Sequence, residues 1–171
     1  MIEIEIRLLA EGDAAAYWNL RLEALGLEPQ SFAESAEEHR ETSIESAAAR
    51  LREAEEGSFV MGAFRSGALV GMAGFFREKH LKARHKGRIW GVYVRANCRE
   101  QGIGRALVSA LLEKVKTLPR LEQVNLTVSS RQIAAKTLYR SLGFETFGIE
   151  RAAFKIGEQY FDEEYMVLRL K

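Results

Sequence analysis

One short stretch constrains the fold of this chain more than any other. Residues 88–94, "RIWGVYV", are almost continuously apolar, as expected of a strand buried on both faces. A polar loop of seven residues follows, and a helical pattern then begins at Gly102-Ile103-Gly104. Glycines at the start of a helix leave the backbone bare, which indicates that a ligand or another chain segment approaches it closely.

The hydrophobic pattern along the rest of the chain predicts a mixed sheet with helices on its faces. The order is one strand, two helices, three strands, a helix, a strand, a helix and two strands, which places the chain in the α/β class, in its α+β form. The predicted strands are 2–8, two strands of a hairpin within 58–78 that turns at Ser66-Gly67, 89–94, 121–130, 144–156 and 159–170. The predicted helices are 14–25, 42–56, 104–118 and 131–142.

Local signals predict where these helices begin and end. Asp13, Thr42 with Glu45 three residues later, and Ser130 are N-cap candidates, because their short polar side chains can accept from the first free backbone N–H groups. Gly143 is placed to cap the last helix at its C-terminus.

Composition predicts one domain spanning residues 1–171, without metal or membrane attachment. The chain is 47% hydrophobic and 29% charged, and its formal net charge of +1 gives no general attraction to nucleic acid. Cys98 is the single cysteine, and no Cys/His spacing typical of a metal site occurs. The N-terminal residues lack a signal-peptide pattern, and no run reaches the roughly 20 apolar residues of a membrane span. We therefore expect a cytoplasmic protein.

The Gly102–Gly104 loop has the chemistry of a phosphate site. Helix N-termini carry unpaired N–H groups and partial positive charge, glycines let phosphate oxygens reach those groups, and Arg99 and Arg105 add charge on either side. The alternative is a strand-to-helix turn that glycine merely eases. A P-loop is excluded because Gly-Lys-Ser/Thr is absent, and a dinucleotide loop fits poorly because Leu107 stands at the third glycine position.

Two signatures together resemble the GCN5-related N-acetyltransferase (GNAT) superfamily. Its acyl-CoA loop has the form Gln/Arg-x-x-Gly-x-Gly/Ala after a strand, which matches residues 99–104 after Val92-Tyr93-Val94. Its helix after the next strand often reads Asn-x-x-Ala-x-x-Leu-Tyr, followed by Gly-Phe. Here the matching residues are Gln132, Ala135, Leu138-Tyr139 and Gly143-Phe144. The resemblance covers nearly the whole chain and implies a central sheet of about seven mostly antiparallel strands, about four helices and one splayed strand pair.

The resemblance also implies a donor, acetyl-CoA, and the residues that bind it. The loop amides would hold the CoA pyrophosphate, and the splayed strand edge would pair with the pantetheine arm, as a peptide adds to a sheet. The residues implied are Val92, Tyr93, Val94, Arg99, Glu100, Gln101, Gly102, Ile103, Gly104, Arg105, Gln132 and Tyr139. Gln132 departs from the family's asparagine by one additional methylene.

The reaction implied is direct acetyl transfer to an amine, with two proton-transfer roles to assign. Tyr139 matches the family tyrosine that serves the departing thiolate, and a phenol remains a donor below its own pKa. The position of the glutamate base of some relatives is Thr127, which is no base. Glu78, His85 and Asp162 are alternatives, and so is a water relay. His85 has the suitable unperturbed pKa of about 6.5, although its cationic neighbours also fit a solvated surface residue.

The resemblance further implies that the acceptor enters opposite the donor, between residues 25–41 and 150–166. Their carboxylates would attract a cationic amine, and apolar side chains would line the pocket unless they are simply core. The residues concerned are Glu28, Glu34, Asp162, Glu163 and Glu164, with Phe32, Trp90 and Phe161. A primary amine on a small molecule (an amino acid, a polyamine or an amine antibiotic) is the predicted acceptor, and a peptide or protein N-terminus is the alternative. A non-catalytic acyl-CoA sensor and a domain that binds no CoA remain other classes.

The basic run 79–88 lacks aromatic residues for base stacking, so a solvated loop is preferred over a nucleic-acid site. Because the early helices are acidic and this run is basic, a homodimer is left open.

Overall fold

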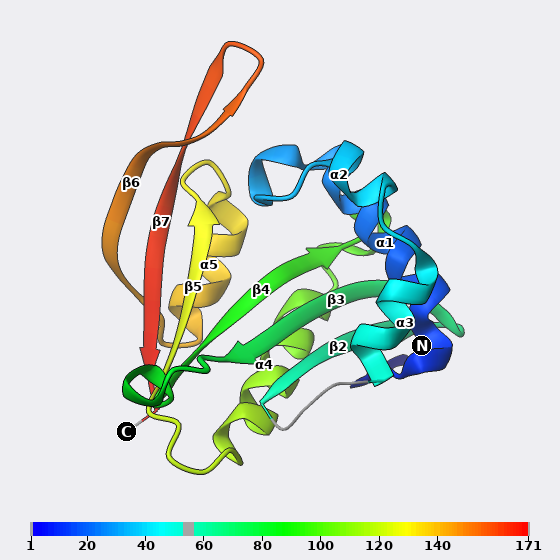
Figure 1. Ribbon diagram of the computed structural model, residues 1–171, viewed down its shortest axis with the longest axis horizontal. Helices are drawn as coiled ribbons and strands as arrows, with labels where there is room; N and C mark the ends of the chain where they lie inside the picture. The colour runs from blue at the N-terminus through cyan, green and yellow to red at the C-terminus, as the bar shows by residue number, and fades with distance from the viewer. Residues whose placement is uncertain (1, 53–56, 171) are drawn as a thin grey trace.

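Seven strands form one mixed sheet in the computed structural model, which describes residues 2–52 and 57–170 (Figure 1). The strand order is β1-β2-β3-β4-β5-β7-β6, and all neighbours are antiparallel except β4 and β5. The strands are β1 (Ile4–Leu8), β2 (Ser58–Arg65), β3 (Ala68–Arg77), β4 (Lys86–Val94), β5 (Gln123–Ser129), β6 (Glu145–Ile156) and β7 (Gln159–Arg169). The mostly antiparallel seven-stranded sheet that the sequence predicts is confirmed.

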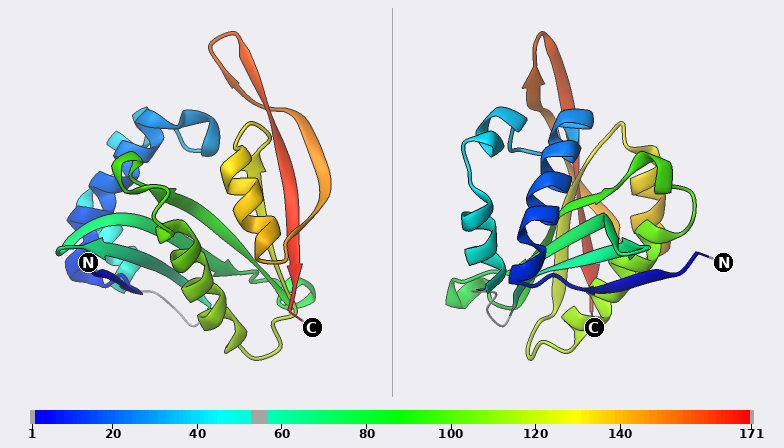
Figure 2. Two further views of the ribbon diagram at one scale, coloured as in Figure 1. Left: turned by 180° about the vertical axis from the view of Figure 1, so that it is seen from behind. Right: turned by 90° about the vertical axis from the view of Figure 1, so that its right-hand side faces the viewer.

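Helices cover both faces of this sheet. Figure 2 shows α4 and α5 on one face and α1 with α3 on the other. Within the described residues the α-helices are α1 (Ala14–Leu27), α2 (Ala36–Arg40), α3 (Ile44–Arg52), α4 (Ile103–Lys116) and α5 (Ile133–Ser141). Short 3-10 helices are η1 (Glu11–Asp13), η2 (Pro29–Ser31), η3 (Leu81–Ala83) and η4 (Ala96–Cys98). The four predicted helices are present, and α2 is an addition of little more than one turn.

Each face of the sheet has its own hydrophobic core. Leu107, Leu111 and Val115 of α4 are fully buried against one face, which confirms the apolar stripe predicted for that helix. Leu20 and Ala24 of α1 are fully buried against the other face. Because both faces are covered, the central strands β2 and β3 are buried along nearly their whole length.

The predicted N-cap Thr42 is wrong, and Asp13 occupies the predicted N-cap position without capping the helix through its side chain. The carboxylate of Asp13 accepts from Arg7 at 2.8 Å and from the N–H of Ala10 at 2.8 Å, and it makes no capping bond to α1. Thr42 donates its hydroxyl to the carbonyl of His39. Helix α3 is capped by the next residue instead, because the hydroxyl of Ser43 accepts from the N–H of Ser46 at 3.0 Å. Short polar side chains have several local partners, and a sequence signal does not choose among them.

For α5 the predicted N-cap is wrong and the predicted C-terminal glycine is confirmed. Gln132, not Ser130, is the N-cap residue, and the buried Ser130 hydroxyl has no partner among the described residues. Gly143 follows the helix with a φ of 99°, as predicted. The predicted end of the helix 42–56, at Glu56, lies outside the described residues.

The only parallel strand pair of the described sheet also has the fewest paired residues. Strands β4 and β5 are paired at Lys86–Gln123, Gly87–Val124 and Arg88–Asn125 only. Beyond these three pairs they diverge, and Figure 1 shows the two strands opening into a V. The edge of β4 after Arg88 and the edge of β5 after Asn125 therefore face a gap in the sheet. Strand β4 begins at Lys86, three residues before the predicted start, because it includes the end of the basic run.

Candidate active site

The free edge of β4 carries an irregularity at the middle of the gap. The register between β3 and β4 shifts between Met72 and Gly74, opposite Gly91, whose φ is 63°. A Cβ at position 91 would lie 3.2 Å from Nη1 of Arg21. Glycine is therefore favoured here both by the backbone conformation and by the arginine packed over it. Past this bulge, the side chains of Val92 and Val94 pack towards α4, and that of Tyr93 packs towards α1.

The loop between β4 and α4 presents a run of free backbone donors. None of the N–H groups from Glu100 to Arg105 has a hydrogen-bond partner within the described part of the chain. Gly102, with a φ of 78°, is the N-cap of α4, and a Cβ placed there would meet nothing within 4 Å. Six unpaired N–H groups at a helix N-terminus fit a pyrophosphate, which supplies acceptor oxygens and negative charge.

The two arginines predicted beside this loop are already engaged with protein groups. Nε of Arg99 donates to the carbonyl of Val94 at 2.8 Å, and its Nη1 lies 2.7 Å from the carboxylate of Glu28. Arg105 donates to the hydroxyl of Ser141 at 2.7 Å. Arg99 therefore ties the loop to the end of β4 and to the chain after α1, and it occupies the Val94 carbonyl.

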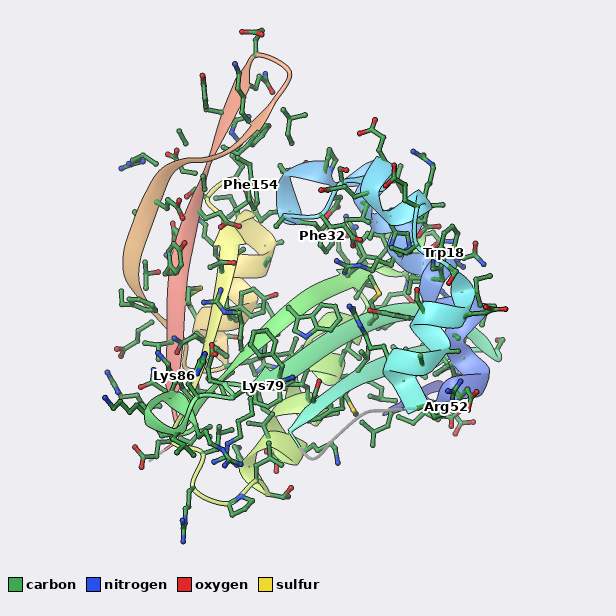
Figure 3. All side chains as sticks on the ribbon, in the orientation of Figure 1. Trp18, Phe32, Arg52, Lys79, Lys86 and Phe154 are labelled. Carbon is green, nitrogen blue, oxygen red and sulfur yellow. The ribbon has the colours of Figure 1, made fainter. Side chains whose placement is uncertain are left out.

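A large cleft opens beside the gap, on the face of the sheet that carries α1 and α3. Its volume is about 970 Å³, and both segments predicted to hold the acceptor contribute to its walls. Ser31, Phe32 and Glu34 come from one segment, and Phe154 and Glu163 come from the other. Figure 3 shows Phe32 and Phe154 at one end of the molecule, far from Lys79 and Lys86. The cleft thus lies towards the open end of the V.

Two carboxylates lie on the wall formed by β6 and β7. Glu163 is 8% exposed and pairs in register with Glu150 across the two strands. The hydroxyl of Tyr165 donates to Glu150, whereas Glu163 has no hydrogen bond or ion pair within the described residues. Burial, and secondarily the charge of Glu150, raises the pKa of Glu163, while Arg88 on the floor of the cleft acts in the opposite direction. A carboxylate whose pKa is raised is a stronger base than an exposed one.

Three donors gather on the helical wall, formed by α1 and α3. The guanidinium groups of Arg21 and Arg50 lie 5.4 and 5.7 Å from the ring centre of Trp90. Nε of Arg21 binds Glu34 at 2.8 Å, but its buried Nη1 has no partner. The hydroxyl of Tyr17, a residue 3% exposed, is likewise buried and finds no acceptor in the described residues. Burial raises its pKa, and the charges of Arg21 and Arg50, with a hydrogen bond from Arg50, act in the opposite direction.

One hydrogen bond spans the mouth of the V. Nε2 of Gln132, at the start of α5, donates to the hydroxyl of Ser31 in η2 at 2.9 Å. Tyr139, about two turns further along the same helix, is 6% exposed and packs edge-on against Phe144. Its hydroxyl makes no hydrogen bond to any described residue, and burial raises its pKa, so the phenol stays protonated.

Comparison with known proteins identifies this arrangement. The sequence profile of the Acetyltransferase (GNAT) family matches residues 19–144, which is most of the chain. The chain belongs to the GNAT acetyltransferase family. The resemblance drawn from residues 99–104 and 132–144 is therefore confirmed, and so is the predicted fold.

Solved GNAT structures share this fold over almost their full lengths. A GNAT acetyltransferase from Streptococcus pneumoniae is 22% identical, with a TM-score of 0.89 over 98% of this chain and 100% of that one. A ribosomal-protein-alanine N-acetyltransferase from Brucella melitensis is 25% identical, with a TM-score of 0.84 and coverages of 97% and 99%. The putative acetyltransferase yncA from Salmonella typhimurium, solved with acetyl-CoA, is 22% identical, with a TM-score of 0.85 and coverages of 98% and 94%.

The structure does not bring the three base candidates from the sequence to the cleft of this GNAT protein. His85 is exposed just before β4, at the end where β4 and β5 are still paired, and its carbonyl accepts from Glu122 and Gln123. Glu78 is joined through its backbone to Lys86 at that same end. Asp162 binds Arg151 and the N–H of Ala152 away from the cleft lining. Thr127 does line the cleft.

The carboxylates predicted for the acceptor rim separate in the same way. Glu34 and Glu163 line the cleft, whereas Glu28 is paired with Arg99 and Glu164 lies against Lys136 of α5 at 3.0 Å. Of the apolar candidates, Phe32 and Trp90 line the cleft and Phe161 does not. Sequence reasoning missed Tyr17, Arg50 and Glu150, which look like ordinary residues of amphipathic elements. Glu150 is the first residue of the predicted acceptor segment 150–166, and Tyr17 and Arg50 belong to helices that flank the segment 25–41. These positions are the one signal that could have found them.

No group of three or more His, Cys, Asp or Glu side chains is placed to hold a metal ion in residues 2–52 and 57–170. In the same residues, no helix has both the length and the apolar character needed to span a bilayer.

Proposed function

We propose that this protein transfers the acetyl group of acetyl-CoA to the primary amine of a small molecule. One observation supports the proposal above all. The β4–β5 pairing stops after three residues, and the loop that follows the free edge of β4 presents six unpaired amides. An extended arm that ends in a pyrophosphate needs this combination of a strand edge and an anion site. Acetyl-CoA is the donor used in the GNAT family, and its acetyl thioester supplies the electrophile.

The residues that would hold the donor follow from this geometry. The N–H groups of Glu100 to Arg105 would bind the pyrophosphate, with Gly102 leaving room for its oxygens. The backbone of Val92 and Tyr93 would pair with the pantetheine amides, since the Val94 carbonyl is engaged by Arg99. The Gln132 amide lies at the mouth of the gap, where exchange of Ser31 for a donor amide would keep its hydrogen bond.

Glu163 is the group we propose to accept the proton of the incoming amine. A free alkyl ammonium has a pKa of about 10 and no lone pair, so it must lose a proton before it attacks. Glu163 lies in the acceptor cleft, lacks a partner, and has a raised pKa, which makes it a stronger base than an exposed glutamate. It faces Ser129 of β5, beside Thr127, at the edge of the gap.

Tyr139 is the proposed proton donor to the departing thiolate. Its phenol is protonated because burial raises its pKa, and its hydroxyl has no competing partner in the described structure. Replacement by phenylalanine removes only the oxygen. We expect Tyr139→Phe to retain donor affinity and to lower turnover by about 100-fold, which is typical for loss of one general acid.

The experiment that tests the function measures stability and turnover on one sample. A thermal unfolding assay with acetyl-CoA should show stabilisation, about 2.7 kcal/mol at a hundred times Kd. Thiol release is then followed with amino acids, polyamines, amine antibiotics and an alanine-initiated peptide. Stabilisation with turnover supports the enzyme. Stabilisation without turnover on any amine would favour an acyl-CoA sensor, and no stabilisation would refute the assignment of the loop.

A peptide N-terminus is the second candidate acceptor, because the Brucella melitensis protein of similar fold is a ribosomal-protein-alanine N-acetyltransferase. Preferential thiol release with the alanine-initiated peptide would favour it over a small-molecule amine.

A further inference from the structure

The helical wall of the acceptor cleft contains unused hydrogen-bond donors that converge. The hydroxyl of Tyr17 and Nη1 of Arg21 are both buried, and neither finds an acceptor within the described residues. Arg50 has no ion pair there. It acts on the Tyr17 hydroxyl only as a hydrogen-bond donor, and its guanidinium lies at the same Trp90 ring as that of Arg21. All four side chains line the same cleft.

This arrangement is unfavourable unless something negative completes it. A buried donor without an acceptor costs free energy, and two guanidinium groups at one indole ring repel each other. Glu34 neutralises only part of this charge, since within the described residues it pairs with Nε of Arg21 and makes no ion pair with Arg50. The phenol of Tyr17 cannot help by ionising, because burial raises its pKa. An anionic group placed between the three donors would satisfy all of them.

The charges that line the cleft are complementary to those of a zwitterion. The helical wall carries Arg21 and Arg50 against one carboxylate, Glu34. The opposite wall carries Glu150 and Glu163, with Arg88 on the floor beside Glu163. Positive charge is therefore in excess on one wall and negative charge on the other, while the formal charges of these six side chains sum to zero. A diamine would place a second cation against the arginines. An amine with an uncharged substituent in place of the carboxylate would leave these hydrogen-bond donors without a charged acceptor.

We propose that Tyr17, Arg21 and Arg50 form a carboxylate subsite, and that the acceptor is an amino acid or another small molecule that carries one carboxylate besides its amine. This rests on the proposed function, because the amine is then directed to Glu163. The donor loop lies at the N-terminus of α4, which packs on the opposite face of the sheet, so the subsite serves the acceptor and not the phosphates of CoA.

The test uses matched ligands and reads binding, independently of catalysis. The full chain, saturated with CoA so that no transfer occurs, is titrated calorimetrically with each standard L-amino acid. The decarboxylated counterparts, such as 2-phenylethylamine for phenylalanine and agmatine for arginine, are titrated in parallel. We expect at least one amino acid to bind about tenfold or more tightly than its counterpart, the advantage of a charge-assisted hydrogen bond. Equal affinities, or no amino acid bound, would overturn the proposal.

Two variants assign the effect to these residues. Tyr17→Phe removes one hydroxyl that finds no acceptor, and Arg50→Gln removes an exposed charge without an ion pair, so both are expected to fold. Each should weaken the preferred amino acid by about tenfold and its decarboxylated counterpart by less than about twofold. Arg40→Gln, an exposed arginine of α2 outside the cleft lining, is the control and should change neither. Equal weakening of both ligands in Tyr17→Phe and Arg50→Gln would refute the subsite.

Thiol release from acetyl-CoA separates this inference from the function on which it rests. Selective binding of an amino acid that is not acetylated would keep the subsite and overturn the acetyltransferase proposal for that acceptor. Acetylation of decarboxylated amines with no selectivity for amino acids would keep the acetyltransferase proposal and overturn the subsite.

Discussion

At the scale of single residues, the most informative contrast is between two adjacent glutamates of β7. Glu163 is buried in the cleft without a partner, and burial raises its pKa. Glu164 points to the other face of the sheet. Burial alone would raise its pKa too, but hydrogen bonds from Lys136 and Thr146 and the nearby positive charges outweigh burial and lower it. One residue along a strand reverses the face, and with it the chemistry of the same side chain.

We predict that Glu163→Gln lowers kcat and raises stability. Loss of a general base typically costs about 100-fold or more in rate. A carboxyl group with a raised pKa in the folded state stabilises the protein only at low pH, and that contribution is lost as pH rises through the raised pKa. The variant should therefore have a higher Tm than the parent at about pH 8 and little advantage at about pH 4. Thermal unfolding at both pH values measures this.

Glu164→Gln is the matched control for that experiment. Its lowered pKa means that the ionised form stabilises the fold above the pKa of the unfolded chain, so the variant should lose stability at about pH 8 and not gain it. Similar responses of the two variants would contradict the assignment of Glu163.

The pH dependence of kcat/KM gives a second prediction at this scale. The base works only when deprotonated, so activity should rise with pH through the raised pKa of Glu163. The neighbours that face it are Glu150 of β6, which raises this pKa, and Arg88 of β4, which lowers it. Removing the charge of Glu150 by Glu150→Gln should move the acidic limb to lower pH. Arg88→Gln should move it to higher pH, and shifts in the same direction would count against Glu163.

At the scale of elements, α4 joins the fold to the proposed donor site. Its buried side, including Ile103 and Leu107, fixes its N-terminus at the end of β4, and the unpaired amides follow from that placement. Gly104 stands in its first turn, and a Cβ there would lie 3.7 Å from Leu138 and 3.8 Å from Val94, which are ordinary contact distances. The position therefore tolerates a methyl group and little more.

We predict that Gly104→Phe weakens acetyl-CoA binding while Gly104→Ala does not. The larger ring must either displace Leu138 and Val94 or project over the amides, whereas alanine fits the available space. The expected rise in Kd for Gly104→Phe is about tenfold or more, equivalent to about 1.4 kcal/mol. Calorimetry measures the affinity, and circular dichroism checks that the helices persist. Unchanged affinity in a folded Gly104→Phe would reject the loop as the pyrophosphate site.

The sequence predicts some features of these elements correctly and others not. Gly143 and the Gly102–Gly104 turn follow from short-range backbone requirements, and the structure has them as helix ends. Asp13, Thr42 and Ser130 are equally local signals, and Asp13 does stand at the N-cap of α1. None of the three side chains makes the predicted capping bond, because each has another partner or none within the described residues. His85 is a base candidate in the sequence only because the ordinary pKa of a histidine suits a base. No sequence pattern shows at which residue β4 and β5 separate. Tyr17, Arg50 and Glu150 become notable only when three distant elements enclose one cleft.

At the scale of the whole molecule, the sheet consists of two unequal parts joined at three register pairs. Strands β1 to β4 form one part and β5, β7 and β6 form the other. Few hydrogen bonds hold the parts together at the gap, so local opening is expected there before it occurs in the cores.

We predict that hydrogen exchange maps this junction. Amides of β4 after Arg88 and of β5 after Asn125 should exchange faster than those of the central strands β2 and β3. Saturating CoA should slow exchange in 89–94 and in the loop 100–105, and it should leave β1 unaffected as an internal reference. Protection confined to another surface would contradict the assignment of the donor to the gap.

The three-pair junction has a further consequence if the donor fills the gap. An arm that hydrogen-bonds to the free edge of β4 becomes in effect a missing strand, and it comes from the substrate and not from the polypeptide. The complete sheet then exists only while the donor is bound. Each departure of CoA would reopen it, so every catalytic cycle would break and rebuild part of the architecture of the protein itself.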